Sequence, residues 1–188
     1  IAMAVNGKKK ILMLSDHALS TSGVGVQSRF LINGLVGTDK YTFRQFGAAM
    51  KHQDYNVQKV NDDFIIKPVD GFGTQEMLRL ALATENPDMI LIFTDPRFFI
   101  WLWEMEDEIR QICPIAYWHV WDNKPVPEFN KHFYEATDLI NCHSHLTYEM
   151  ISELYPEKTN FVPHSLPVEL YNTLDDKEIK NRRIEILG

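Results

Sequence analysis

The feature that most constrains this chain is a set of three short, continuous apolar runs. They are 10–15 (KILMLS), 88–94 (DMILIFT) and 114–121 (PIAYWHVW). None alternates between polar and apolar residues as a half-exposed strand does, and such runs are typical of strands buried on both faces of a parallel sheet. Parallel strands need long crossover connections, which are usually helices. The sequence therefore predicts an α/β fold.

The segments between these runs fit alternating strands and helices. Further strands are expected at 41–48, 64–69, 138–142 and 160–162, and helices at 24–36, 74 or 75 to 85, 98–112 and 146–154. This order predicts a Rossmann-like, doubly wound, mostly parallel sheet. Ligands of such sheets bind at the carboxyl ends of the strands, so the informative residues should follow the strands directly.

Length and composition favour a single globular domain. The 188 residues are 45% hydrophobic and 24% charged, which is enough for a proper core. We expect this domain to span 10–170, with 1–9 as vector-derived residues and a disordered start. Residues 171–188 are rich in charge and are expected to be a linker or the start of a missing second domain.

The same composition argues against several partners and compartments. A net charge of -7 leaves no basic surface for nucleic acid. The two cysteines, Cys113 and Cys142, lie in apolar stretches and fit a reducing compartment, so a cytoplasmic location is expected. No apolar run approaches the length of about 18 residues that a transmembrane helix needs, so no transmembrane segment is expected.

The loop after the first strand, 16–25 (DHALSTSGVG), places Gly23 and Gly25 at the start of a helix. Glycines there let backbone N–H groups approach a ligand, and a helix amino end favours an anion. A dinucleotide fingerprint would need a third glycine where Ser28 stands, which argues against a nicotinamide oxidoreductase. A tight strand-to-helix turn with no ligand explains the two glycines equally well.

His119 ends the third apolar run and is the main catalytic candidate. At a strand end, an imidazole can donate a hydrogen bond to a ligand hydroxyl or act as an acid or base near neutral pH. The alternative is a hydrogen-bonded core histidine. Asp122 follows closely as a possible second catalytic group, and Trp121 is the aromatic residue best placed to stack on the apolar face of a ligand ring.

Other strand ends supply weaker candidates. Asp16 and His17 are expected either to contact hydroxyls of a ligand or to cap a turn. Asp95 and Arg97 form a polar cluster in which Arg97 binds an anionic ligand or makes a surface salt bridge.

The segment that contains Cys142, His143 and His145 raises the question of zinc. No fourth ligand accompanies these three residues in the sequence, so no metal site is expected.

Three segments resemble the family 4 retaining glycosyltransferases in order and spacing. They are 11–35 (ILMLSDHALSTSGVGVQSRFLINGL), the strand end YWH at 117–119, and 160–166 (NFVPHSL), and the resemblance covers about residues 10 to 188. Ser22 stands where the family often has the first glycine of its GGVG-like turn. His164 and Ser165 stand where it often has Asn and Gly, near the cleft between the two domains.

The resemblance implies the acceptor-side, amino-terminal half of a GT-B fold. Its activity would be transfer of a sugar from a nucleoside diphosphate sugar to an acceptor hydroxyl, with retention. The acceptor would be a carbohydrate, a lipid or a small molecule. The family requires neither a cofactor nor a metal, and the donor binds mostly to the second domain, so the chain alone is expected to be inactive.

Two alternatives stay open: a non-catalytic Rossmann-like module that binds a nucleotide or carbohydrate, and a nucleotide-sugar epimerase of the same fold. For the transferase, we expect Gly23, Gly25, His119 and the 164–165 segment to line one cleft.

Overall fold

The computed structural model describes residues 7–51, 54–168 and 174–187. The strands are β1 (Lys9–Asp16), β2 (Tyr41–Ala48), β3 (Gln58–Asn61), β4 (Phe64–Pro68), β5 (Met89–Phe93), β6 (Ile115–His119), β7 (Leu139–Cys142) and β8 (Thr159–Phe161). The helices are α1 (Gly23–Val36), α2 (Gln75–Glu85), α3 (Ile100–Trp103), α4 (Glu106–Arg110), α5 (Lys131–Glu135), α6 (His145–Ser152) and α7 (Asp176–Leu187). Two short 3-10 helices are η2 (Pro96–Phe99) and η3 (Glu128–Asn130).

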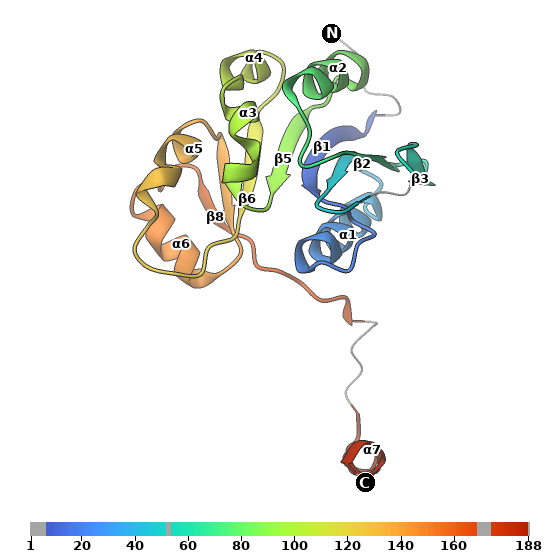
Figure 1. Ribbon diagram of the computed structural model, residues 1–188. Coiled ribbons are helices and arrows are strands. Elements are labelled where there is room, and N and C mark those ends of the chain that lie inside the picture. The colour runs from blue at the N-terminus through green and yellow to red at the C-terminus, as the bar shows by residue number, and fades with distance from the viewer. Residues whose placement is uncertain (1–6, 52–53, 169–173, 188) are drawn as a thin grey trace.

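The strands form one sheet with the order β3-β4-β2-β1-β5-β6-β7-β8 (Figure 1). All neighbouring strands are parallel except β3 and β4, which pair antiparallel at one edge. The order of the parallel strands reverses direction between β1 and β5. This is the arrangement of a Rossmann-like, doubly wound fold.

The direction of each crossover determines which face of the sheet its helix covers. The step from β1 to β2 runs one way along the sheet, and the steps from β4 onward run the other way. Because such crossovers are right-handed, α1 covers one face and α2 to α6 cover the other.

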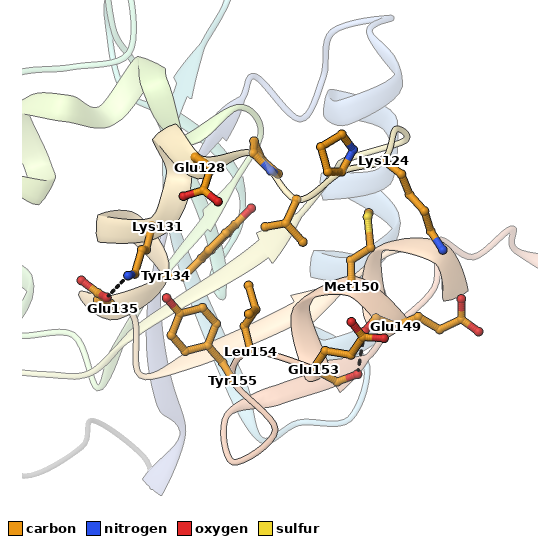
Figure 2. A pocket seen from close by; sticks show the side chains of 14 residues that line it. Lys124, Glu128, Lys131, Tyr134, Glu135, Glu149, Met150, Glu153, Leu154 and Tyr155 are labelled. Carbon is orange, nitrogen blue, oxygen red and sulfur yellow. Dashed lines mark hydrogen bonds and ion pairs between the residues drawn. The ribbon is translucent and has the colours of Figure 1, made fainter.

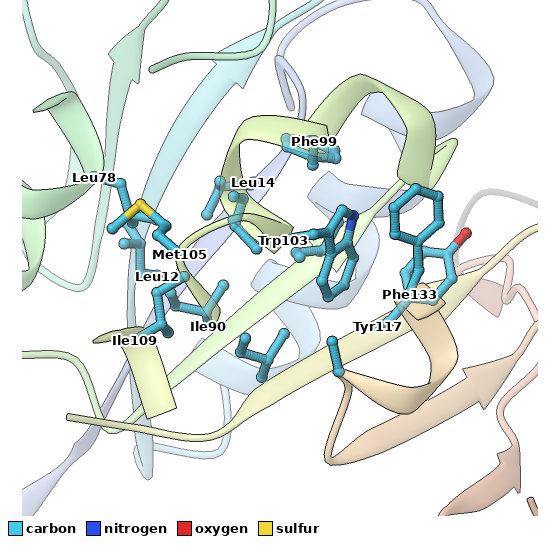
Figure 3. Packing of buried hydrophobic residues seen from close by; sticks show 14 of the residues in the cluster. Leu12, Leu14, Leu78, Ile90, Phe99, Trp103, Met105, Ile109, Tyr117 and Phe133 are labelled. Carbon is cyan, nitrogen blue, oxygen red and sulfur yellow. The ribbon is translucent and has the colours of Figure 1, made fainter. Parts of the chain in front are cut away.

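The buried residues agree with this assignment. Ile11 and Met13 pack in one cluster with Ile32 of α1, whereas Leu12 and Leu14 pack in another. Figure 3 shows the second cluster, in which Leu78, Phe99, Trp103, Met105, Ile109 and Phe133 come from helices and loops on the far side of the sheet from α1.

The predicted fold class is confirmed, and the three apolar runs are the strands β1, β5 and β6 at its centre. The single helix expected at 98–112 is wrong, because the segment forms η2, α3 and α4. Phe99 (φ -114°, ψ 26°) and Met105 (φ -116°, ψ 21°) have non-helical backbone and separate these pieces. Phe98 therefore leaves the core, is 50% exposed, and stacks on Phe72 with ring centroids 4.4 Å apart.

Three further elements of the sheet domain were absent from the expected list, namely β3, η3 and α5. β3 (QKVN) is polar and exposed at the sheet edge, so it carries no apolar pattern. α5 (KHFYE) is too short to show helical periodicity. α5 carries Tyr134, whose hydroxyl lies 2.8 Å from His119 Nε2.

The last described helix, α7, adds no side chain to this core. Residues 1–6 of the expected vector-derived start and 171–173 of the expected linker lie outside the described residues. α7 buries none of its side chains and stands away from the sheet in Figure 1. In the described ranges, no helix combines the length and apolar character needed to cross a membrane.

Candidate functional site

The candidate site is the C-terminal edge of the sheet, defined as the edge where the parallel strands end. Ser15 of β1 pairs with Phe93 of β5, and Phe93 pairs with Trp118 of β6, so these strands end side by side. The loops that follow β1 and β5 flank the point where the strand order reverses. Doubly wound sheets bind their ligands in the crevice at this point.

The loop after β1 is held by its own side chains. Ser22 caps α1: its hydroxyl accepts a hydrogen bond from the Gly25 amide at 3.0 Å and donates one to Asp16 Oδ2 at 2.7 Å. The structure thus brings Asp16 and Ser22 together, and the hydrogen bond between them occupies one oxygen of the Asp16 carboxylate. The serine that replaces a glycine of the family pattern acts here as a helix cap.

The two glycines of this loop differ in role. A methyl group at Gly25 would overlap the Ser20 hydroxyl and lie 2.5 Å from the His17 carbonyl oxygen, whereas one at Gly23 would meet nothing within 4 Å. Gly25 therefore allows α1 to pack closely on the loop backbone. The expectation that Gly25 admits a ligand is corrected, while Gly23, which is exposed, still fits that role.

His17 is also part of the packing. Its side chain is 3% exposed, its Nδ1 accepts a hydrogen bond from the Leu19 amide at 3.2 Å, and its ring lies against Gly47. The expected contact between His17 and an acceptor hydroxyl is therefore corrected to a turn-stabilising role.

Gln45 of β2 is a residue that sequence reasoning missed. It is 1% exposed, and its amide donates to Ser15 Oγ at 2.7 Å and to the Asp16 carbonyl at 2.9 Å. Its Oε1 accepts from the Ala18 amide at 3.1 Å. A glutamine within an otherwise buried strand was the available signal, because buried polar side chains require such partners.

His119 lies in the interior and is 0% exposed. Its Nδ1 lies 2.8 Å from the Tyr117 hydroxyl and its Nε2 2.8 Å from the Tyr134 hydroxyl. Tyr117 donates to the Thr94 carbonyl at 3.1 Å, and Asn130 donates to Tyr134 at 3.4 Å. We name these five residues the His119 network.

The donors and acceptors of this network determine its protonation. Because the Tyr117 proton goes to the Thr94 carbonyl, Tyr117 must accept from His119, which places the imidazole proton on Nδ1. Nε2 then accepts from Tyr134. Burial, together with nearby His143, lowers the pKa of His119 to about 3, so the ring is neutral at physiological pH.

The geometry favours the core-histidine alternative for His119. A fully buried ring with both nitrogens bonded has no atom for a sugar hydroxyl, so the expected direct catalytic contact is corrected to a structural role. Asp122 is exposed, and the structure does not bring it against His119.

An open strip of side chains lies at the same edge and consists of Asp95, Arg97, Trp121 and Phe129. Arg97 binds both carboxylate oxygens of Asp95 through Nε, at 2.9 and 3.0 Å, and holds the pKa of this carboxyl below its ordinary value. Its guanidinium lies over the Phe129 ring, 5.2 Å from the centroid. Phe129 in turn contacts Trp121 edge to face at 5.9 Å and is 49% exposed.

This strip unites residues that the sequence suggested separately. Asp95, Arg97 and Trp121 were candidates, and Phe129 was missed because it belongs to the unpredicted η3. The Arg97 salt bridge expected as the alternative is present. The guanidinium and the aromatic faces remain partly open, with the Arg97 side chain 55% exposed.

His164 lies beyond β8 and is exposed, in contrast to His119. Its ring contacts Phe93, Trp118 and His143 at centroid distances of 5.6, 5.1 and 5.0 Å. Partial burial and the neighbouring His143 lower its pKa.

Ser165 is attached to α1 by Gln27, another residue that sequence reasoning missed. The Gln27 amide donates to the Ser165 carbonyl at 3.0 Å and accepts from the Ser165 amide at 3.1 Å. This pair of bonds brings the 164–165 segment beside the start of α1. The expectation that Gly23 and the 164–165 segment share one edge therefore agrees with the geometry, while Gly25 and His119 are buried behind it.

The three residues considered for zinc point to separate partners. Cys142 is fully buried, and burial raises the pKa of its thiol to about 12. His143 donates from Nδ1 to the His119 carbonyl at 3.0 Å, and His145 pairs with Glu149 at 3.3 Å. Among the described residues, no group of three or more His, Cys, Asp or Glu side chains is arranged to hold a metal ion.

Comparison with known proteins gives no family assignment. No protein-family model matches the chain, and no curated protein matches it significantly.

Proposed function

We propose that this chain is the acceptor-side half of a GT-B glycosyltransferase that transfers a sugar from a nucleoside diphosphate sugar to an acceptor hydroxyl. The observation that carries the proposal is the open strip beside the point where the strand order reverses. It combines a carboxylate, a guanidinium and two aromatic rings at the edge where this fold binds ligands.

Each group in the strip matches a feature of a sugar acceptor. Aromatic faces suit the apolar side of a pyranose ring, and the Asp95 carboxylate accepts hydrogen bonds from hydroxyls. Arg97 provides a cation for an anionic group on an acceptor or donor. The α1 amino end has no acidic residue in its first turn and favours negative charge.

The remaining catalytic groups would come from the second domain. That domain would hold most of the nucleotide sugar, and closing the two halves would place the donor against the acceptor. Here the His119 network would fix the ends of β5 and β6 without touching a substrate. No cofactor or metal is part of this proposal.

A non-catalytic module that binds a carbohydrate or nucleotide is the second candidate. It is favoured by the burial of His119, which removes the expected acid or base from contact with a ligand. Both candidates use the same open strip, so they differ in chemistry and not in location.

The test is calorimetric titration of the chain with UDP, GDP and ADP sugars, combined with a transfer assay. The half-enzyme proposal predicts dissociation constants of about 1 mM or weaker and no transfer, because half a cleft buries little of the donor. Micromolar binding or measurable transfer by this chain would contradict it. If the half-enzyme proposal holds, joining the chain to a donor-binding second domain should produce transfer. A non-catalytic binding module would stay inactive after the same fusion.

A further inference from the structure

A groove with a volume of about 1030 Å³ lies between the 124–128 loop, α5 and α6 (Figure 2). It is separate from the open strip, and no part of the proposed reaction uses it. Its volume is at the upper end of the range of about 300–1,000 Å³ that small-molecule sites occupy. The groove is therefore large enough for a segment of another protein.

The floor of the groove is apolar and partly open. Val126, Met150, Leu154 and Tyr155 line it, and Leu154 is 55% exposed. Methionine adapts its shape to different partners and is frequent on binding surfaces of this kind.

The walls of the groove are acidic on both sides. Glu128 and Glu135 lie on one side, and Glu149 and Glu153 lie on the other, one helical turn apart (Figure 2). Lys124 and Lys131 are the lysines of the lining. The four carboxylates exceed these two cations, and the whole chain carries a net charge of -7.

Tyr155 has charges of both signs around it, because the Lys158 ammonium lies over its ring, 5.1 Å from the centroid. Burial and the nearby carboxylates of Glu135 and Glu157 raise the pKa of its hydroxyl. One ion pair neutralises part of the wall, because Lys131 lies 4.0 Å from Glu135. His145 lies 3.3 Å from Glu149 and contacts the other side of the wall.

We propose that this groove binds an amphipathic helical segment of a partner protein, with apolar side chains on the floor and Lys or Arg side chains against the two acidic walls. Helices bind apolar grooves in this way, and charge complementarity selects a basic partner. A linear polyamine would satisfy the walls but would place only a thin methylene chain on the apolar floor. This proposal is independent of the transferase proposal.

The experiment is a titration of the ¹⁵N-labelled chain with a capped peptide of about 18 residues, with leucines at i, i+3 and i+4 and lysines on the opposite face. Amide signals of α5, α6 and the 124–128 loop should shift, with a dissociation constant of about 100 µM or tighter. Because the contacts are partly electrostatic, raising the ionic strength should weaken binding. A peptide with glutamate in place of lysine should not bind.

Matched variants distinguish this groove from general attraction to an acidic protein. Glu149→Gln with Glu153→Gln should weaken binding about fivefold, since each partly exposed ion pair contributes only a small part of the affinity. Leu154→Ala should weaken it about threefold or more. Each control makes the matching change outside the groove. Glu104→Gln with Asp107→Asn removes two carboxylates, and Leu80→Ala truncates a leucine of α2 that is 56% exposed.

Equal weakening by the control variants would overturn the proposal, as would shifts centred outside the groove. Binding of spermine at least as tight as that of the peptide would make the groove a polyamine site instead. Absence of any shift at millimolar peptide would also reject it.

Discussion

His119 and His164 lie at the same edge of the sheet, yet their surroundings are opposite. The His119 ring is fully buried with a tyrosine hydroxyl on each nitrogen, whereas His164 is exposed beside Trp118 and His143. Tyr134 of α5 covers the first histidine, with its hydroxyl 2.8 Å from His119 Nε2, whereas the second histidine follows β8 and is exposed. Position at a strand end therefore does not determine which side chain meets a ligand, because the next connection decides whether that side chain is covered.

Removing each imidazole gives the largest expected contrast. His119→Ala should lower the free energy of unfolding by about 3–5 kcal/mol, because it leaves a cavity and two buried tyrosine hydroxyls without their partner. His164→Ala should change it by less than about 1 kcal/mol. Urea unfolding measures both. If both variants lose the same free energy of unfolding, His119 is not a buried structural residue and His164 is not an open one.

The two glycines of the first loop provide a second contrast. Gly25→Ala should cost about 1–3 kcal/mol of stability, because the new methyl group overlaps Ser20 and the His17 carbonyl. Gly23→Ala should be neutral or stabilising by up to about 1 kcal/mol, since its methyl group meets nothing and the unfolded chain loses freedom. Equal effects in thermal unfolding would show that Gly25 is not a packing position.

The depressed pKa of His119 predicts a pH dependence of stability. Its pKa falls from 6.5 in the unfolded chain to about 3 in the folded chain, so the unfolded state binds the proton first. The neutral ring stabilises the fold fully above pH 6.5. This contribution declines as the pH falls towards about 3, with a loss of about 2 kcal/mol at pH 5.

Urea unfolding between pH 7.5 and pH 5 tests this dependence. His119→Gln should flatten it, even though the variant is less stable overall. His132→Gln, which changes an exposed histidine of α5, should keep the dependence of the parent chain. A parent chain with no change in stability over this range would show that His119 is protonated while folded.

The smallest expected effect concerns the link between α1 and the open edge. Gln27→Ala removes both hydrogen bonds to Ser165 and should accelerate hydrogen exchange of the Ser165 amide about fivefold. The amide of Ile92 in the core should exchange as before. If exchange at Ser165 does not change, this link does not hold the 164–165 segment.

Much of the fold follows from patterns within the sequence itself. The apolar runs of β1, β5 and β6 predict buried parallel strands, and the spacing within α1 and α2 predicts their bounds closely. The polar edge strand β3 and the short α5 carry no periodic signal, since their positions depend on contacts with distant parts of the chain.

The candidate site was less predictable for the same physical reason. Sequence position placed His119 and Asp95 at strand ends, which is where the structure has them. It could not show that Tyr134 would cover His119, or that Phe129 would lie under Arg97, because η3 and α5 bring these residues in. Burial at an edge depends on tertiary packing that local patterns do not contain.

The central claim is that ligands contact the open strip and not the His119 network. Chemical-shift mapping of the ¹⁵N-labelled chain with a simple acceptor sugar, methyl α-glucopyranoside at high millimolar concentration, tests it most directly. We expect the largest shifts in the open strip, at 95–97, 121 and 129, with smaller shifts at 20–23 and 164–165 and with the imidazole nitrogens of His119 unchanged. Shifts centred on the His119 imidazole and Tyr134, with the open strip unaffected, would contradict this prediction.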